Sequence, residues 1–154
     1  KKEKLTDDLD TIIPTMLRYK VMADKGSMYN TPPCFAIYMA GLVFQWVEQQ
    51  GGVAALEKIN AKKAGLLYDY LDASKVFRPV ADKKDRSIMN VTFTLPDDDM
   101  TAAFIRMAAE RGMINIKGHR SVGGCRASIY NAMPMEGVEK LVQCMKDFEA
   151  GQRA

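Results

Sequence analysis

The sequence is poor in the residues that build metal centres and disulfide frameworks. It holds one histidine, His119, and three cysteines among 154 residues. Cys34, Cys125 and Cys144 lie far apart without a CxxC pair, so we expect neither a disulfide framework nor a structural zinc site. A single histidine also excludes a metal held by two histidines. We expect reduced and mostly buried thiols, which are typical of cytoplasmic proteins.

The chain also lacks a long apolar run and a strong charge of either sign. Polar and charged residues interrupt every apolar stretch before it reaches the roughly 18 residues that span a membrane, and the net charge is +3. Composition therefore favours neither a membrane nor a nucleic-acid partner. Hydrophobic residues make up 47% and charged residues 27%, the balance of an ordinary folded domain.

The first residues predict that this chain is a piece of a longer protein. It begins Lys1-Lys2-Glu3-Lys4, with no methionine, apolar signal core or cleavage site. Residues 1–11 are charged and aperiodic, so we expect a surface helix or loop there.

The next segments predict an extended stretch followed by a helix. Residues 12–22 are expected to be extended, because Pro14 restricts Ile13. Thr31 is placed to cap the N-terminus of a long helix over about residues 33–50.

A glycine pair separates this helix from a second one. Gly51–Gly52 is expected to end the first helix, and the second runs over about residues 53–71. The apolar side chains expected to form the core are Ile37, Ala40, Gly41, Val43, Phe44 and Val47 in the first helix, and Leu56, Ile59, Ala64, Leu67 and Leu71 in the second.

Beyond residue 72 strands and helices alternate, which predicts an α+β domain with a mainly antiparallel sheet covered by helices. Short strands are expected over residues 77–80, 86–95, 113–116 and 127–130, and helices over residues 97–110 and about 135–148. The acidic run Asp97–Asp99 is typical of a helix start, where it complements the helix dipole. We favour that interpretation over a set of metal ligands.

The segment 117–126 offers the most chemistry. It combines Lys117, His119, Arg120 and Arg126 with three glycines. Arginine grips carboxylates and phosphates with two parallel hydrogen bonds, and glycine lets the backbone approach a ligand. The segment therefore suits an anionic small molecule, although a solvated basic turn would have the same composition.

The run from Asn30 to Pro33 is a second candidate. Free N–H groups at a helix start, with a hydroxyl beside them, form a natural phosphate site. Simple helix capping by Thr31 is the other interpretation.

Four motifs together resemble the C-terminal part of the phosphoserine aminotransferase family. They are GSMYNTPP (26–33), RSIMNV (86–91), KGHRSVGG (117–124) and RASIYNA (126–132), and their order and spacing also agree. The resemblance covers nearly the whole chain from about residue 15.

The resemblance implies a pyridoxal-phosphate enzyme of the aspartate aminotransferase fold. Such enzymes are cytoplasmic homodimers whose active sites lie between subunits. The implied reaction moves an amino group between glutamate and 3-phosphohydroxypyruvate in serine biosynthesis. In many bacteria the same enzyme also serves pyridoxine synthesis.

Site residues follow from the matched motifs. Asn30 and Thr31 are expected to contact the phosphate of pyridoxal 5'-phosphate in the neighbouring subunit. His119 and Arg120 are expected to hold the substrate phosphate, and Arg126 the substrate α-carboxylate.

The resemblance also implies what this chain lacks. The family's Schiff-base lysine, the aspartate paired with the cofactor's pyridine nitrogen and the stacking aromatic residue all lie upstream. We therefore expect no catalytic residue in this chain, and an inactive chain until the N-terminal portion joins it. Residues 1–50 would be the tail of the large domain with its connecting helix, and residues 51–154 the small C-terminal domain.

Two other hypotheses for the function of the chain remain open at this point. One is a stand-alone α+β module that captures phosphate or nucleic acid with the basic loop. The other is a structural or dimerisation piece whose polar motifs are only caps and turns.

Overall fold

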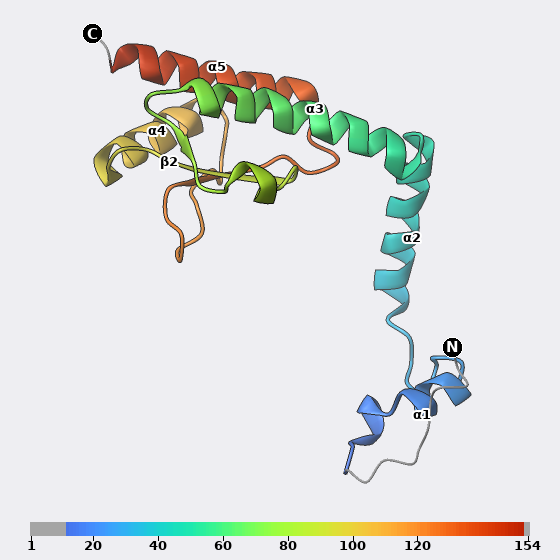
Figure 1. Ribbon diagram of the computed structural model, residues 1–154. Helices are drawn as coiled ribbons and strands as arrows, with labels where there is room; N and C mark the ends of the chain where they lie inside the picture. Colours follow the sequence, from blue (N-terminus) through green and yellow to red (C-terminus); the bar gives the residue numbers. More distant parts are fainter. Residues whose placement is uncertain (1–11, 153–154) are drawn as a thin grey trace. The chain divides into compact units, whose positions relative to one another are not determined.

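The computed structural model describes residues 12–152 (Figure 1). The chain divides into two compact units between Trp46 and Val47, here called the N-terminal unit and the C-terminal unit. Each is described by itself. The surface helix or loop expected over residues 1–11 falls outside the described residues.

The N-terminal unit begins with short helices. A 3-10 turn, η2, spans Thr15–Leu17, and α1 spans Tyr19–Asp24. The extended segment expected over residues 12–22 is therefore wrong. Pro14 restricts only the residue before it, and Lys20 Nζ lies 2.7 Å from Asp24 Oδ2, a pairing one helical turn apart that supports α1.

Helix α2 spans Cys34–Gln49, close to the expected range. It begins three residues after Thr31, and its first residue donates a backbone hydrogen bond to the carbonyl of Pro32. Thr31 is therefore not its N-cap, because the two prolines continue the connecting segment before the helix starts.

The core expected on α2 is also wrong for this chain. No residue of α2 is buried, and Ile37 and Phe44 are 58% and 70% exposed. The helix is apolar on most of its circumference, so its periodicity does not define one packed face.

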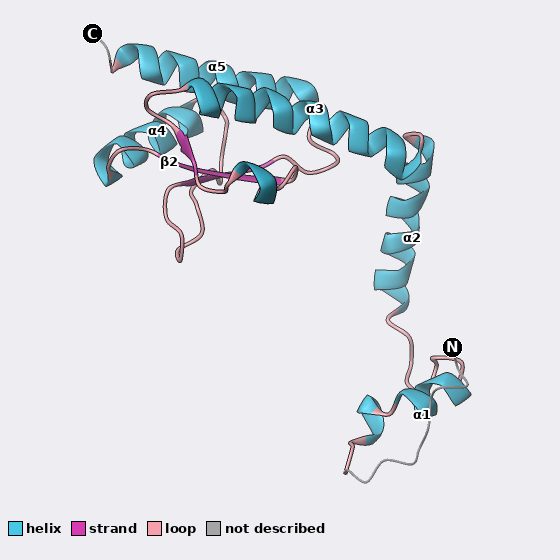
Figure 2. Cartoon of the chain, viewed as in Figure 1, coloured by secondary structure: helices cyan, strands magenta, loops and turns pink. Residues whose placement is uncertain are grey.

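The C-terminal unit contains the remaining helices and all the strands of the described chain (Figure 2). They are α3 (Gly52–Ala73), β1 (Arg78–Pro79), η3 (Lys83–Asp85), β2 (Asn90–Thr94), α4 (Asp98–Glu110), β3 (Cys125–Ser128) and α5 (Met135–Gly151). The strands form one antiparallel sheet in the order β1-β2-β3. The predicted α+β class with an antiparallel sheet is confirmed.

Helices α3, α4 and α5 enclose the core with the sheet. Helix α3 packs on α5 and on β2, and α4 packs on α5. Four phenylalanines meet at their centre with rings mostly edge to face, the shortest centroid distance being 4.9 Å between Phe77 and Phe104; they are Phe77, Phe93, Phe104 and Phe148. Such aromatic pairs add to the free energy of burial.

On α3 the predicted core is confirmed at Leu56, Ala64, Leu67 and Leu71, all of which are buried. Ile59 is wrong, since it is 42% exposed. The stripe that faces the core runs instead through Asn60 and Lys63, two polar residues that are almost fully buried.

Each of the four expected strands differs from the structure in extent or is absent. The strand expected over residues 77–80 is only β1 (Arg78–Pro79), which pairs with β2 at Thr94 and Phe93. The strand expected over residues 127–130 is β3 (Cys125–Ser128), because Cys125 and Arg126 already pair with Phe93 and Thr92.

Residues 113–116 form no strand, because Asn115 adopts a φ of +61° that breaks an extended run. The strand expected from Arg86 begins only at Asn90, because the hydroxyl of Ser87 accepts the N–H groups of Met89 and Asn90. Those two N–H groups are thus occupied locally where the strand was expected to begin.

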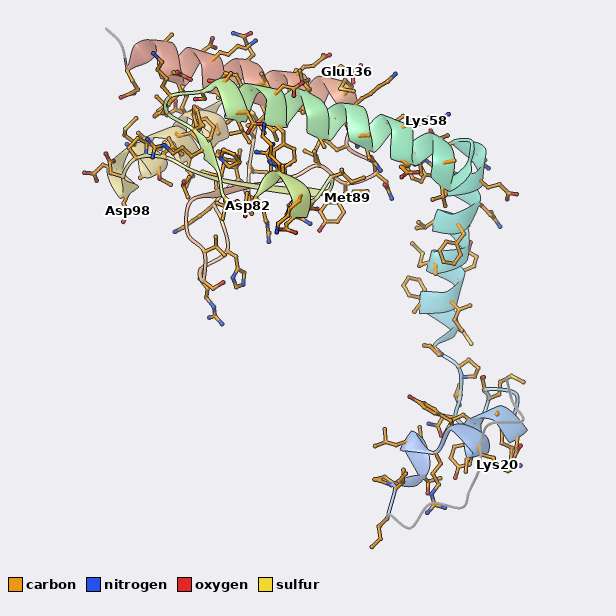
Figure 3. All side chains as sticks on the ribbon, viewed as in Figure 1. Lys20, Lys58, Asp82, Met89, Asp98 and Glu136 are labelled. Atoms are coloured by element: carbon orange, nitrogen blue, oxygen red, sulfur yellow. The ribbon has the colours of Figure 1, made fainter. Side chains whose placement is uncertain are left out.

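The acidic run begins α4, as expected, with Asp98 (Figure 3) and Asp99 in the first turn of the helix. Asp97 Oδ1 accepts a hydrogen bond of 2.7 Å from the backbone N–H of Met100.

Within residues 12–152 no three metal-type side chains gather in one place. Over the same residues, no helix is long and apolar enough to cross a membrane. All three thiols are free; Cys125 and Cys144 are buried and Cys34 is exposed.

Candidate active-site face

Strands β2 and β3 give the sheet two chemically different faces. Side chains alternate along a strand, and Val91, Phe93, Cys125 and Ala127 are buried against the helices. We call this the covered face. The alternate positions form the open face, which is polar throughout; its residues are Asn90, Thr92, Thr94, Arg126 and Ser128.

Arg126 is the only charged residue among those alternate positions of β2 and β3. It sits directly across from Thr92 in the register and is half-buried. Its Nε is buried without a hydrogen-bond partner, and no ion pair between described residues involves it. A half-buried guanidinium without an anion is costly. This position therefore suits the carboxylate of a ligand, which arginine binds with two parallel hydrogen bonds.

A hydrogen-bonded trio lies one position further along the same face. Asn90 Nδ2 donates to the Tyr130 hydroxyl at 3.0 Å, and Ser128 Oγ donates to Asn90 Oδ1 at 3.2 Å. Sequence reasoning did not single out these residues. Their place on the open face could have been predicted from side-chain alternation. Ser128 lies two residues after Arg126, and Asn90 lies two residues before Thr92, which pairs with Arg126.

The loop between residues 117 and 124 is a tight hairpin that needs its glycines. It hangs from the sheet on the side away from α3 and α5 (Figure 1). Gly118 N–H bonds to the carbonyl of Gly124 at 2.9 Å, and a Cβ on Gly118 would lie 1.9 Å from the carbonyl oxygen of Gly123. Gly123 and Gly124 both have positive φ, +75° and +57°. Glycine therefore suits these positions, through the missing Cβ at Gly118 and the positive φ at Gly123 and Gly124.

His119 and Arg120 lie on the outer part of this loop, and both are exposed. His119 Nδ1 is 2.7 Å from Ser121 Oγ and accepts the Ser121 N–H at 3.3 Å. Both contacts are satisfied with Nδ1 as acceptor, which leaves the proton of the neutral ring on Nε2. Arg120 makes no ion pair with the described residues. Two donors for an external anion therefore sit side by side.

Asn30 and Thr31 belong to the N-terminal unit, in the segment that leads into α2. Both side chains are exposed, and Asn30 Nδ2 lies 3.3 Å from Met16 Sδ. The amide and the hydroxyl are uncharged donors suited to a phosphate oxygen.

The motif RSIMNV acts as an anchor ahead of β2. Arg86 forms two hydrogen bonds with Asp72 at 2.9 and 2.6 Å, and its guanidinium lies 4.4 Å from the ring centre of Tyr68. This arginine holds the pKa of Asp72 down to about 2. The Tyr68 hydroxyl donates to the carbonyl of Ser87. Helix α3 thereby fixes the chain immediately before Asn90.

A pocket of ≈ 440 Å³ runs beside β3. Arg126, Arg111 and Lys140 line it together with apolar side chains of residues 113–116 and of α5. The nearby thiol of Cys125 is no nucleophile, because burial raises its pKa to about 12.

Comparison with known proteins gives this arrangement its family. Residues 10–141 match the family described as aminotransferase class-V. The chain belongs to the class-V aminotransferase family. This family depends on pyridoxal phosphate.

Curated relatives within this family are phosphoserine aminotransferases. The enzyme of Bacillus cereus (strain ATCC 14579) is 49% identical over 152 residues, which are 99% of this chain and 42% of the relative. That of Lactococcus lactis subsp. cremoris (strain SK11) is 56% identical over 138 residues, covering 89% of this chain and 38% of the relative. This class-V aminotransferase chain thus spans about two fifths of the length of those relatives, and it corresponds to their C-terminal portion.

Solved structures agree. The phosphoserine aminotransferase of Bacillus circulans subsp. alkalophilus superposes with a TM-score of 0.85 at 45% identity, over 91% of this chain and 39% of that one. The pyridoxal-phosphate-bound enzyme of Trichomonas vaginalis gives 0.82 at 41% identity, over 90% of this chain and 40% of that one. The resemblance found in the four motifs is confirmed.

Proposed function

We propose that this chain is the C-terminal portion of a cytoplasmic phosphoserine aminotransferase of serine biosynthesis. The enzyme would move an amino group between glutamate and 3-phosphohydroxypyruvate, giving O-phosphoserine, and in a bacterial host it would also serve pyridoxine synthesis. The observation that carries this proposal is Arg126, half-buried on the open face with its Nε unpartnered. The loop that leads into β3 presents two further cation-capable donors, His119 and Arg120.

These two groups of donors match the two charged ends of the substrate. A carboxylate is planar and fits one guanidinium side-on, so Arg126 would orient the α-carboxylate. A phosphate dianion needs several donors, which Arg120 and His119 Nε2 would supply. Holding both ends fixes which atom of the substrate faces the reacting centre.

Asn30 and Thr31 fit a cofactor phosphate by the chemistry of their donors. Both are exposed, uncharged donors in the segment before a helix of 16 residues. They would hold the phosphate of pyridoxal 5'-phosphate, which supplies an electron sink for amino-group transfer. The lysine that carries this cofactor would lie in the upstream portion of the enzyme.

Residues 1–50 would complete the large domain, and residues 51–154 would form the small domain. Support comes from α2, whose apolar side chains are exposed in this chain; they include Phe35, Ile37, Leu42, Val43 and Phe44. Exposed apolar surface of this extent is typical of an interaction site. The upstream portion and a second subunit of a homodimer would cover it and complete the active site.

The test replaces Arg126 with lysine in the full-length enzyme. Arg126→Lys keeps the charge and removes the fork of parallel donors. Loss of one charged hydrogen bond costs roughly 1.5–3 kcal/mol, so kcat/KM for glutamate should fall about ten- to a hundredfold.

The control is Arg106→Lys on the exposed side of α4, which should change nothing. The chain of residues 1–154 alone, mixed with pyridoxal phosphate, glutamate and 3-phosphohydroxypyruvate, should show no turnover. Unchanged kinetics in Arg126→Lys would remove this residue from the site, and turnover by the chain alone would show that it holds its own catalytic lysine.

A further inference from the structure

Lys63 is the most completely buried cation of the described chain, with 0% exposure. It lies in the middle of α3, on the stripe that packs on the core. Its Nζ lies 2.7 Å from the carbonyl oxygen of Tyr130, 2.9 Å from that of Met133 and 3.3 Å from that of Ile129. No carboxylate takes part in these contacts.

The geometry suits the charged form of this lysine. An ammonium has three N–H donors and no acceptor, which matches the three carbonyl oxygens one for one. A neutral amine would turn its lone pair toward one of these oxygens. Burial lowers the pKa of Lys63. The three carbonyl oxygens oppose that effect, because they accept hydrogen bonds from the charged ammonium group.

A second buried side chain holds the same loop. Asn60, one turn earlier on α3, donates from Nδ2 to Asn131 Oδ1 at 2.7 Å. Lys63 thus binds the backbone of residues 129–133, which we call the β3 exit loop, and Asn60 binds the side chain of Asn131 within it. Two buried side chains of α3 therefore hold this loop by hydrogen bonds, whereas an exposed turn can close with its own backbone hydrogen bond alone.

The β3 exit loop continues directly from the open face. Ile129 N–H bonds to the carbonyl of Met89 at 2.9 Å, and the Tyr130 hydroxyl accepts from Asn90. Arg126 lies three residues before the first carbonyl that Lys63 binds. A shift of the exit loop would therefore move the end of β3 and the polar trio beside Arg126.

We propose that Lys63 is a positioning residue for the carboxylate subsite: by holding the β3 exit loop on α3 it sets the place of Arg126 and Tyr130 on the open face. The proposal rests on the proposed function, because it takes the Arg126 face as the carboxylate subsite. His119 and Arg120 lie on the hairpin at the opposite end of β3, so the phosphate subsite is independent of this anchor.

The experiment compares two probes on the full-length enzyme, 2-oxoglutarate for the carboxylate subsite and inorganic phosphate for the phosphate subsite. Lys63→Met keeps the length of the side chain and removes the three donors. Affinity for 2-oxoglutarate should fall roughly tenfold, as for one charged hydrogen bond lost, while affinity for phosphate stays within twofold. Lys62→Met, the exposed neighbour, is the matched control and should alter neither.

A second variant decides the matter if Lys63→Met does not fold. Asn131→Ala removes the Asn60 anchor from an exposed position, and should weaken 2-oxoglutarate about two- to fivefold with phosphate unchanged. Unchanged 2-oxoglutarate affinity in whichever of these variants folds, or equal losses for both probes, overturns the proposal. Failure of the proposed function is distinct: the unaltered enzyme would then show no transamination between glutamate and 3-phosphohydroxypyruvate.

Discussion

The covered face and the open face of the sheet alternate residue by residue along β2 and β3, yet they meet opposite physical demands. On the covered face Val91, Phe93, Cys125 and Ala127 are buried and pack on helices. On the open face Arg126 is left with a buried Nε that lacks a partner. The covered face is packed by the chain itself, whereas the open face keeps one buried donor, Arg126 Nε, without a partner among the described residues. Side-chain alternation thus places core residues and the candidate binding residue next to each other in sequence.

Helix α3 contributes to the core and also holds the segments that flank β2 and β3. Its apolar residues pack on the covered side, while Asp72 holds Arg86 ahead of β2, and Lys63 holds the loop after β3. The ends of both strands are therefore fixed from behind the sheet. A binding group is held more accurately when its strand is anchored in this way.

The largest effect should come from the covered face. Phe93 is fully buried, with its ring centroid 5.8 Å from that of Phe77 and 6.1 Å from that of Phe104. Phe93→Ala should lower the free energy of unfolding of this chain by about 3–5 kcal/mol, because it leaves a cavity among these rings. Urea unfolding measures this directly.

The neighbouring residue provides the comparison. Thr92→Val, on the open face, keeps the β-branched shape and should cost less than about 1 kcal/mol. Similar losses for the two variants would mean that the faces do not divide stability and binding as described.

A smaller effect should follow from Gly118→Ala. The new Cβ would collide with the carbonyl oxygen of Gly123, so the hairpin that carries His119 and Arg120 must shift. KM for 3-phosphohydroxypyruvate in the full-length enzyme should rise about tenfold or more, as when a charged hydrogen bond is lost, and the free energy of unfolding should fall by less than in Phe93→Ala, because the exposed hairpin lies outside the core. Gly65→Ala on α3 meets no atom within 4 Å, and should instead stabilise the chain by roughly 0.5–1 kcal/mol. A normal KM in Gly118→Ala would show that the hairpin shape is not required.

The smallest effect concerns the Asp72–Arg86 anchor and pH. The folded pKa of Asp72, about 2, lies below its ordinary 3.8, so folding favours the carboxylate. Its contribution to stability is complete above about pH 4 and is lost as the pH falls toward 2. Asp72→Asn should lower the free energy of unfolding by about 1 kcal/mol at pH 7 and flatten its fall between pH 4 and 2. Asp69→Asn, an exposed carboxylate on the same helix, should leave that fall intact. An unchanged acid profile in Asp72→Asn contradicts the anchor.

Much of the fold was predictable, because the apolar periodicity and the residues that begin or end helices indicated the same boundaries. The helices over residues 34–49, 52–73, 98–110 and 135–151 lie close to the expected ranges. The acidic run Asp97–Asp99 indicated the start of α4, where it complements the helix dipole. A strand was expected over residues 86–95, and β2 lies within that range.

The errors in strand limits arose where a local hydrogen bond or backbone angle ends the strand. The error in the core arose where apolar residues do not pack on the rest of the described chain. Ser87 occupies the N–H groups that a longer β2 would need, and Asn115 bends the chain out of a strand. The apolar residues of α2 were expected to form a core, but no described residue buries them.

The candidate site could be predicted only in part. Arg126, His119 and Arg120 stood out as charged residues among glycines, and their family motif was specific. Whether they bind as expected stays a prediction. Lys63 and Asn60 were missed, although they share the spacing of Leu56, Leu67 and Leu71 on α3. A polar residue in register with an apolar stripe indicates a buried hydrogen-bond anchor.

The most direct test of the central claim is Arg120→Ala in the full-length enzyme, assayed with a phosphorylated and a non-phosphorylated substrate. Arg120 is exposed and unpaired among the described residues, so its loss should not disturb the fold. We expect kcat/KM for 3-phosphohydroxypyruvate to fall about ten- to a hundredfold, as when a charged hydrogen bond is removed, and kcat/KM for hydroxypyruvate to change less than twofold. Equal losses for the two substrates, in a variant that folds normally, would contradict the assignment of this loop to the substrate phosphate.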